Sequence, residues 1–388
     1  MSNVDEIKID QPALSFENSP ESDDEQRKRL EIEELIAQNE NRQNIPVNTL
    51  QKLALTSYGF VNDNLRRILW PQLAGVDVNT LERAPTLGEL QNHPEYNQVV
   101  LDVNRSLKRF PPGIPYEQRI ALQDQLTVLI LRVIKKYPNL RYYQGYHDVA
   151  VTFLLVAGEE VAYAIMEQLS TTHFSECMQE TMEATQRRLM FIWPVVNFEN
   201  PELYQFLQRS TVGTLFALPW YLTWFGHSLN SYKAVVRLYD YFLASPIFTP
   251  IFVTAAILLH RSNEILKEDC DMASVHCLLS RLPEDLPFEH LLKTSSKLYD
   301  KYSLTAIENE VEVLILKEKE QRNVEEKMLL ERRKKLTRST STNRSYNLSQ
   351  WLPNLFTSKS LLVTTAVSIV VGVCAYYYKN QYLSAGIS

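Results

Sequence analysis

The chain has 388 residues, of which 45% are hydrophobic and 22% charged, so it can bury a substantial core and is not disordered as a whole. Residues 1–26 hold eight acids against one lysine (1 − 8 = −7), so the net charge of −6 leaves the remainder near neutral (−6 + 7 = +1). No broad basic stripe with interleaved aromatic residues occurs, which argues against a nucleic-acid partner. Only 10 glycines are present and long alternating apolar and polar runs are missing, which favours an all-α protein over a sandwich or barrel.

Residues 1–26 are expected to form a disordered acidic tail, because they offer too little apolar surface to fold alone. A helical lead-in is predicted over 27–58, where apolar residues recur among charges until Ile45-Pro46 interrupts the pattern. From 59 to 292, amphipathic segments alternate with prolines, which predicts one all-α domain. Its helices are expected over 62–73, 99–110, 115–137, 147–157, 159–169, 181–191, 201–208, 215–225, 233–242, 252–267 and 273–279.

Residues 293–336 are predicted to form a charged helical extension, whose apolar stripe lets it stay extended or pack on the domain. A linker rich in Ser, Thr and Asn is expected over 337–359. Within the domain, the uncharged run from Tyr241 to Leu259 is long enough to span a membrane, but it contains two prolines. We therefore predict two short helices joined by a proline turn inside the core.

Residues 360–378 carry no charged side chain and are bracketed by Lys359 and Lys379. A helix of this length rises about 28 Å, enough to cross a hydrocarbon core of about 30 Å. Trp351 on one side and the tyrosines at 376–378 on the other are typical of the two membrane interfaces. The segment is therefore predicted to be a transmembrane helix, a buried soluble helix being the alternative.

The charges around this segment indicate its orientation. Seven basic residues lie between 332 and 359, whereas Lys379 alone follows, and this bias keeps the main domain in the cytosol. Residues 379–388 would then form a short luminal tail. Because so few residues follow the segment, we expect post-translational insertion as a single-pass, tail-anchored protein. Its length suits the thin bilayer of the endoplasmic reticulum (ER).

Val99, Asp102 and Arg105 recur every three residues, so on a helix they share an arc of about 120°. Asp102 can brace the guanidinium of Arg105 one turn along. An ordinary surface ion pair, which is worth little, has the same spacing. The spacing alone does not separate a pre-organised functional arginine from such a pair.

The triplet Tyr143-Gln144-Gly145 precedes an apolar segment that begins at His147. Gly145 permits a tight backbone where the helix starts, so Gln144 would project from a helix N-terminus, a place suited to phosphates. A surface glutamine in a turn is the alternative. His147 is interpreted as a packed residue and Asp148 as a helix-start residue, because no nucleophile signature accompanies them.

Motifs of other reaction centres are missing from the sequence. It contains no Gly-x-x-x-x-Gly-Lys-Ser/Thr loop, no Gly-x-Ser-x-Gly elbow and no His-Glu-x-x-His, and its four cysteines and its histidines lack metal-ligand spacing. We therefore expect the chain to hold no nucleotide, metal or cofactor of its own. One cation and one amide on a shared surface are instead what a GTPase can borrow from another protein.

Taken together, these residues resemble the TBC-domain GTPase-activating proteins of Rab GTPases. The resemblance runs from about Gly59 to Leu292, and it comprises motifs in the family's order. The matches are Arg66 and Trp70 to Arg-x-x-x-Trp; Val99, Asp102 and Arg105 to Ile-x-x-Asp-x-x-Arg, with valine replacing isoleucine; Tyr143, Gln144 and Gly145 to Tyr-Gln-Gly; and Arg237, Leu238 and Asp240 to Arg-Leu-Trp-Asp, with Tyr239 replacing tryptophan.

The resemblance implies a dual-finger mechanism, in which Arg105 is an arginine finger and Gln144 a glutamine finger, both inserted in trans into a Rab active site. The chain would then be a GTPase activator and no enzyme itself, because the Rab carries the GTP and the Mg²⁺. The residues implied to support the fingers are Asp102, Tyr143, Gly145, Arg66 and Trp70.

Besides these two replacements, the sequence departs from the family pattern where Tyr146-His147 stands in place of the common Met-Asn and Ser106 in place of the usual threonine. With the C-terminal segment, these features resemble an ER-anchored branch that acts on the Rab of ER-to-Golgi traffic and is linked to reticulons. The location implied is the membrane of the ER or early Golgi. Two other classes stay open: a non-catalytic membrane-anchored tether for Rab GTPases, and a structural membrane protein assembled through 303–336.

Overall fold

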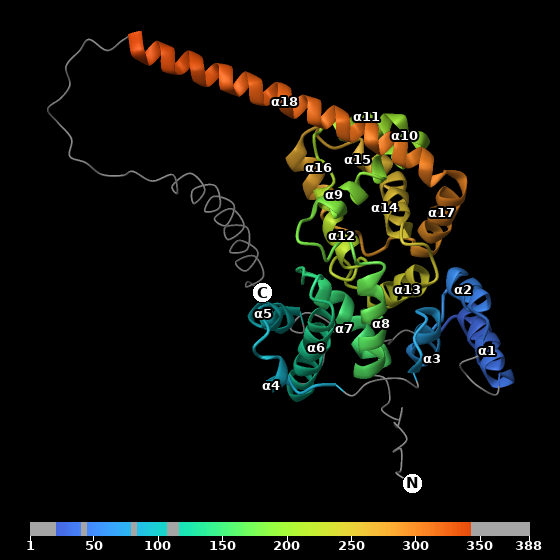
Figure 1. Cartoon of the computed structure of the whole chain (residues 1–388). Coiled ribbons are helices and arrows are strands. Elements are labelled where there is room, and N and C mark those ends of the chain that lie inside the picture. The colour runs from blue at the N-terminus through green and yellow to red at the C-terminus, as the bar shows by residue number, and fades with distance from the viewer. Residues whose placement is uncertain (1–20, 40–44, 79–83, 107–115, 343–388) are drawn as a thin grey trace, which may run out of the picture. The chain divides into compact units, whose positions relative to one another are not determined.

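The computed structural model describes residues 21–39, 45–78, 84–106 and 116–342, with side chains described to residue 334 (Figure 1). The chain divides into two compact units, Met1–Glu318 and Lys319–Ser388. Every regular element among the described residues is a helix, which confirms the all-α prediction for that part of the chain. The elements of the lead-in and the first half of the domain are α1 (Asp23–Gln38), α2 (Val47–Leu55), α3 (Asp63–Leu73), α4 (Leu87–Leu90), α5 (Tyr96–Ser106), α6 (Tyr116–Lys136), α7 (Tyr146–Ala157) and α8 (Glu159–Thr171).

The second half of the chain continues the helical array to Thr342. Its elements are α9 (Glu183–Leu189), α10 (Ile192–Glu199), α11 (Pro201–Arg209), the 3-10 helix η2 (Leu215–Ala217), α12 (Leu218–Leu222), α13 (Tyr232–Leu243), α14 (Thr249–His260), α15 (Ser262–Ile265), α16 (Met272–Leu279), α17 (Phe288–Lys301) and α18 (Leu304–Thr342).

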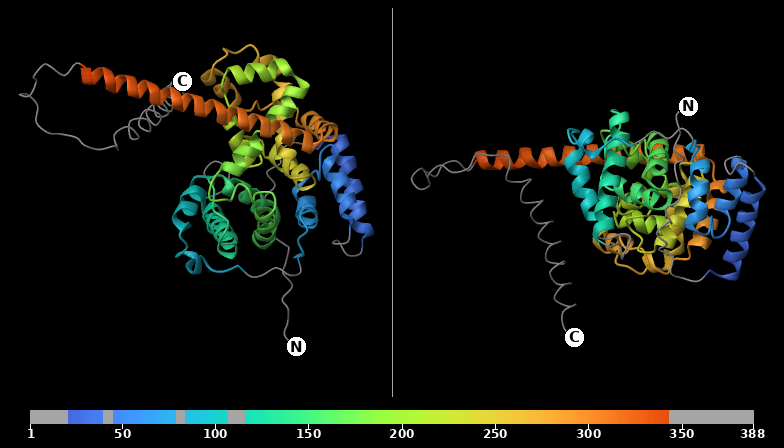
Figure 2. Two further views of the ribbon diagram at one scale, coloured as in Figure 1. Left: turned by 45° about the horizontal axis from the view of Figure 1, so that its top comes forward. Right: turned by 90° about the horizontal axis from the view of Figure 1, so that it is seen from below.

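Two helices form the centres of the packing. Helix α7 packs against α3, α5, α6 and α8, and α14 packs against α10, α12, α15 and α17 (Figures 1 and 2). Nearly every side chain of both helices is buried, as expected for helices that are apolar around their whole circumference. Helix α13 contacts α2 and α3.

The uncharged run from Tyr241 to Leu259 forms the end of α13 and most of α14, with a turn at Pro246 between them. The prediction of two helices joined by a proline turn inside the core is therefore confirmed. None of the helices in the described ranges has the length and apolarity needed to cross a bilayer. The predicted transmembrane helix, 360–378, lies outside those ranges, as do residues 1–20 of the acidic tail.

Helix α1 begins at Asp23, so residues 23–26 are helical and do not belong to the disordered tail that we predicted. A capping box explains this start. The Ser22 side chain accepts a hydrogen bond from the backbone of Glu25, and the Glu25 carboxylate accepts one from the Ser22 backbone at 2.8 Å. Lys233 of α13 pairs with Glu25 at 2.5 Å, so tertiary contact offsets the local excess of acids.

The domain continues past its predicted end at Leu292. That boundary falls inside α17, whose Leu291, Leu292 and Leu298 are buried against the core. The first turns of α18 also pack on the domain through Ile307 and Val311. Of the two possibilities for the charged extension, its beginning is therefore packed, and the helix runs beyond the predicted linker start at 337.

A buried carboxylate joins α13 to α3. Asp240 is fully buried and accepts hydrogen bonds from the Nε of Arg66 at 3.1 Å and from the indole Nε1 of Trp70 at 2.7 Å. The backbone N–H of Phe60 donates to the same carboxylate at 3.0 Å. Arg66 is also buried and pairs with Asp63 at 2.9 Å. Both charges are thus compensated, as buried ions require.

The turn before Phe60 must pass close to this carboxylate. Gly59 has φ +55°, and a Cβ at this position would lie 2.3 Å from the Asp240 Oδ2, so only glycine fits. Arg237, one turn before Asp240, donates to the carbonyl of Ala54 at 2.9 Å and pairs with Glu289 of α17 at 2.6 Å. The segment 237–240 therefore fastens α2, α3 and α17 to α13.

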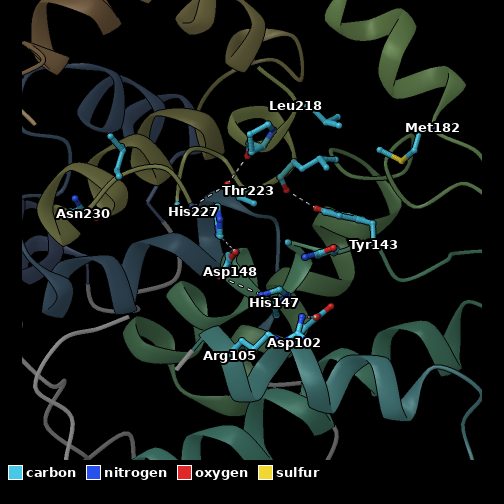
Figure 3. Close-up of a pocket in the computed structure, with 16 residues that line it drawn as sticks. Asp102, Arg105, Tyr143, His147, Asp148, Met182, Leu218, Thr223, His227 and Asn230 are labelled. Carbon is cyan, nitrogen blue, oxygen red and sulfur yellow. Dashed lines mark hydrogen bonds and ion pairs between the residues drawn. The ribbon is translucent and has the colours of Figure 1, made fainter. Parts of the chain in front are cut away.

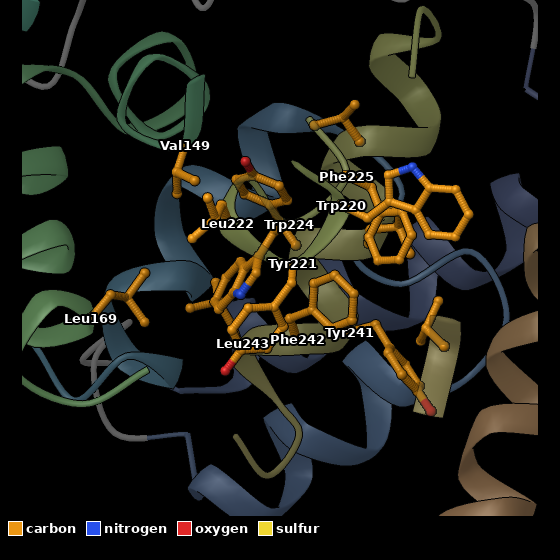
Figure 4. Close-up of a cluster of buried hydrophobic side chains, with 14 of the residues drawn as sticks. Val149, Leu169, Trp220, Tyr221, Leu222, Trp224, Phe225, Tyr241, Phe242 and Leu243 are labelled. Atoms are coloured by element: carbon orange, nitrogen blue, oxygen red, sulfur yellow. The ribbon is translucent and has the colours of Figure 1, made fainter. Parts of the chain in front are cut away.

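Aromatic side chains fill the space between α12, α13 and the loop that joins them (Figure 4). Phe225 stacks between Trp220 and Phe242, with ring centroids 5.8 and 6.1 Å away. Trp224 meets Tyr239 edge-on at 5.4 Å. Trp224 and Phe225 both have positive φ, 47° and 66°, which is costly for aromatic residues. Burial of their rings holds this strained loop in place.

Neutralising the buried carboxylate should destabilise the domain strongly. In Asp240→Asn the buried Arg66 cation loses the charge of its Asp240 partner, so we expect a loss of about 3–5 kcal/mol. The urea unfolding midpoint measures it. The matched control, Asp300→Asn on the exposed side of α17, should change stability by less than about 0.5 kcal/mol. Equal shifts in the two variants would contradict the structural role of the pair.

Acid should destabilise the fold through His173, which meets Trp224 edge-on at 5.6 Å. Burial lowers the pKa of His173 to about 4, whereas an unfolded histidine titrates near 6.5. Between these values the unfolded state binds the proton first, so stability falls as pH decreases, by up to about 1.4 kcal/mol per pH unit. His173→Gln should therefore lose less melting temperature than wild type between pH 6.5 and 4.5. The exposed His260→Gln should follow wild type; the same behaviour from His173→Gln would refute the assignment.

Candidate functional site

A cavity of about 780 Å³ lies where three segments of the domain meet (Figure 3). The last turn of α5 forms one side, the turn that starts α7 forms the base, and the stretch from α12 to α13 forms the opposite wall. Met182 completes the apolar lining, which that wall provides through Leu218, Pro219, Leu222 and Leu229. An apolar wall facing a few polar groups is typical of a recognition site.

Arg105 lies in the last turn of α5, where the helix dipole favours a cation. Its side chain is 71% exposed, while that of Asp102 is 2% exposed, and the Nη1 of Arg105 lies 3.8 Å from the Asp102 Oδ1. Val99, the third residue of the predicted face, is buried. The helix therefore turns Val99 and Asp102 inward and leaves the guanidinium of Arg105 extended at the cavity.

Asp102 is held mainly by neutral donors. Its Oδ2 accepts a hydrogen bond from the Nε2 of Gln98 at 3.0 Å and another from the hydroxyl of Tyr142 at 3.2 Å. The contact with Arg105 is longer than a hydrogen bond. The predicted brace of Arg105 by Asp102 is thus present as a loose ion pair.

Gln144 is exposed and lines the same cavity as Arg105. Its neighbours turn the other way: Tyr143 is buried and its hydroxyl donates to the carbonyl of Leu222 at 2.8 Å. Gly145 caps α7 with φ +108°, and a Cβ there would lie 2.9 Å from the Cγ2 of Thr223. No hydrogen bond of the Gln144 side chain is found among the described residues, so the carboxamide is available at the start of α7.

His147, Asp148 and His227 also line the cavity, and Tyr142 contacts His147 next to it; sequence reasoning assigned none of these side chains to the site. The hydroxyl of Tyr142 lies 2.8 Å from the Nδ1 of His147, whose Nε2 lies 3.5 Å from the Asp148 Oδ1. The Nδ1 of His227 lies 2.9 Å from the other carboxylate oxygen of Asp148 (Figure 3). Asp148 does lie in the first turn of α7 and His147 is packed, but both also line the cavity.

Burial sets the protonation states of this group. It lowers the pKa of His147, although the carboxylates of Asp148 and Asp102 oppose the shift, so this imidazole is neutral at pH 7. Burial, reinforced by Asp102, raises the pKa of Tyr142, so its hydroxyl keeps its proton. The sequence held no signal for His227, because only the fold brings residue 227 beside residue 148.

Arg66 and Trp70, predicted to support the site, do not line the cavity. Both belong to the buried network around Asp240, so their role in the structure is to hold α3 against α13. The other three residues predicted to support the site do line the cavity beside Arg105 and Gln144. They are Asp102, Tyr143 and Gly145. In the described parts of the chain, no three His, Cys, Asp or Glu residues are grouped so that they could hold a metal ion.

This arrangement can present one cation and one amide to the surface of another molecule. It offers no activated serine or cysteine beside His147, because the polar partners of that ring are a tyrosine and an aspartate. The chemistry that the site can supply is therefore charge stabilisation and orientation of a polar group on a partner.

Residues 63–266 match the family described as the Rab-GTPase-TBC domain. The chain is 48% identical to TBC1 domain family member 20 of Homo sapiens, over 65% of this chain and 63% of the human protein. It is 45% identical to the Bos taurus protein of the same name, over 73% of this chain and 70% of the relative. GTPase-activating protein gyp10 of Schizosaccharomyces pombe is 30% identical, over 65% of this chain and 68% of the relative.

Solved structures show the same fold at low identity. The Ypt/Rab-GAP domain of Gyp1p superposes with a TM-score of 0.58 at 17% identity, covering 71% of this chain and 99% of that one. The flagellar RabGAP TBC domain of Chlamydomonas gives 0.55 at 16% identity, covering 73% and 97%. The chain spans 63–70% of the length of the three sequence relatives described above. The family match, these relatives and the shared fold agree with the resemblance read from the motifs, and the chain belongs to the Rab-GTPase-TBC domain family.

Proposed function

We propose that this chain is a GTPase-activating protein for a Rab GTPase, and that Arg105 and Gln144 enter the active site of the Rab in trans. The observation that carries the proposal is the presence of an exposed guanidinium and an exposed carboxamide at one cavity with an apolar opposite wall. Membership of the Rab-GTPase-TBC domain family supports the class of partner. A yeast relative is itself named a GTPase-activating protein.

The chemistry of GTP hydrolysis explains why these two groups suffice. Negative charge spreads over the oxygens of the transferred phosphoryl group in the transition state, and a positioned guanidinium stabilises that charge. A positioned carboxamide orients the attacking water, the task of a GTPase's own glutamine. The Rab would supply GTP and Mg²⁺, so the activator needs no cofactor.

Substitutions at the two residues should affect stimulated GTP hydrolysis in different ways. Arg105→Ala should lower the stimulated rate by about 10³–10⁵, and Arg105→Lys should be nearly as inactive because lysine lacks the planar fork. Gln144→Ala should lower the maximal rate while leaving the affinity for GTP-bound Rab largely unchanged. A GTP-hydrolysis screen of the full-length protein in detergent against a panel of Rabs measures these rates.

Arg209→Ala is the matched control, because Arg209 is also exposed in the last turn of a helix, α11, and lies away from the cavity. It should retain the wild-type rate. The alternative of a non-catalytic, membrane-anchored tether makes a different prediction. A tether at substoichiometric concentration would leave a pool of Rab-GTP unhydrolysed, whereas an activator empties it. If Arg105→Ala and wild type accelerate hydrolysis equally, the proposed mechanism is wrong.

We further propose that residues 360–378 anchor the protein in the ER membrane, where its partner would be the Rab of ER-to-Golgi traffic. The support is the uncharged segment, its bracketing lysines and the basic residues that precede it. A short apolar span suits a thin bilayer. Reticulon-type ER proteins, which the resemblance implies, would be neighbours in the same membrane.

Two charges within the segment should abolish anchoring. Val367→Lys combined with Val371→Lys places both charges near the bilayer centre, at a cost of about 2.5–3.5 kcal/mol each. We expect this variant to appear in the soluble fraction after carbonate extraction and to lose overlap with an ER marker. The matched control replaces the same two valines by leucine and should stay in the membrane. Retention of the lysine variant in the carbonate pellet would rule out the anchor.

A further inference from the structure

A continuous series of polar contacts runs from α5 to the loop after α12. Figure 3 labels four of its members, Asp102, His147, Asp148 and His227. The series starts at Asp102 and passes through the hydroxyl of Tyr142 and the ring of His147 to Asp148 and His227. Its first member, Asp102, forms the loose ion pair with Arg105. This series of contacts links all three walls of the site. The positions of the protons within it therefore affect how Arg105 is held.

The buried carboxylate of Asp102 depends on each of its hydrogen-bond donors. Its carboxylate is 2% exposed, and its two hydrogen bonds come from Gln98 and Tyr142. The guanidinium of Arg105 lies beyond hydrogen-bond distance and is mostly in solvent. Removing the Tyr142 donor would leave a buried charge with one hydrogen bond, which is costly.

Tyr142 has one hydroxyl proton and two close acceptor sites, Asp102 at 3.2 Å and the Nδ1 of His147 at 2.8 Å. If the proton goes to Asp102, the Nδ1 of His147 must carry a hydrogen and donate it to the Tyr142 oxygen. If the Nδ1 lacks a hydrogen, Tyr142 donates to the ring and Asp102 loses a donor. The tautomer of the neutral imidazole therefore decides which bond forms.

The surroundings of His147 favour the hydrogen on Nδ1. Its Nε2 is 3.5 Å from Asp148, too far for a strong hydrogen bond, and His227 already lies 2.9 Å from the other oxygen of that carboxylate. The charged and titratable groups that face the ring are Asp102 and Arg105 from α5, Asp148 from α7 and His227 from the loop after α12. Of the two carboxylates, Asp102 is the more deeply buried and has the greater need of a donor.

We propose that His147 is a positioning residue for Arg105: its Nδ1–H donates to Tyr142, which directs the tyrosine proton to Asp102 and fixes the carboxylate beside the guanidinium. The inference rests on the proposed function of Arg105. It assigns a role to a position where the sequence departs from the common pattern of its family, and it makes the tautomer of one buried histidine part of the activating site.

Substitutions at residue 147 separate this role from simple packing. His147→Asn places an amide N–H close to the position of Nδ1 and should keep the maximal rate of stimulated hydrolysis. His147→Leu fills similar space without a donor and should lower that rate about tenfold or more, with little change in the KM for Rab-GTP, as for one lost charge-assisted hydrogen bond. Tyr142→Phe should match His147→Leu, and the exposed His260→Asn should match wild type.

A spectroscopic test needs no Rab. Full-length protein in detergent, labelled with ¹⁵N in histidine, should show His147 as the Nδ1–H tautomer at pH 7, and Tyr142→Phe should shift it toward Nε2–H. An Nε2–H tautomer in wild type would overturn the proposal, as would His147→Asn being as impaired as His147→Leu, or His147→Leu being fully active. If no Rab responds to wild type, the proposed function fails, while the tautomer still decides whether the proton path exists.

Discussion

The buried Asp240 carboxylate is the constraint on which the rest of the domain depends. It binds Arg66 and Trp70 of α3 and the backbone at Phe60, and it thereby fixes α13 relative to α3. Helix α3 packs on α7, which begins beside Gln144, and the hydroxyl of Tyr239 on α13 donates to the carbonyl of Thr223 in the opposite wall of the cavity. One carboxylate therefore sets the register between the two sides of the site.

The polar groups at the cavity are of two kinds: some contact one another below the surface, and others extend outward. Asp102, Tyr142 and His147 contact one another below the surface, and these contacts offset part of the cost of burying them. Arg105 and Gln144 are left with few partners of their own and extend outward. In the proposed function, a group that enters another protein's active site keeps part of its hydrogen-bonding capacity for that partner, and two loosely held groups above a hydrogen-bonded lower layer suit this role.

Sequence patterns located most helices, and they failed where tertiary contacts outweigh local signals. Helix α10 was not predicted, because its apolar residues lack helical periodicity and it contains Pro194. Helix α17 was divided by a predicted domain boundary, since its charges conceal the apolar face that packs on α14. The segment 215–225 was expected to be one helix, but it forms η2, α12 and a strained loop held by aromatic packing.

The sequence by itself determined the all-α class, the two motifs that hold Arg105 and Gln144, and the uncharged segment near the C-terminus, because periodicity, motif spacing and charge are local properties of the chain. Only the tertiary structure decided that Arg66 and Trp70 belong to a buried scaffold and that His147, Asp148 and His227 join the site. Burial, and the meeting of residues 79 positions apart in the Asp148–His227 contact, arise from packing between helices, which no local pattern records.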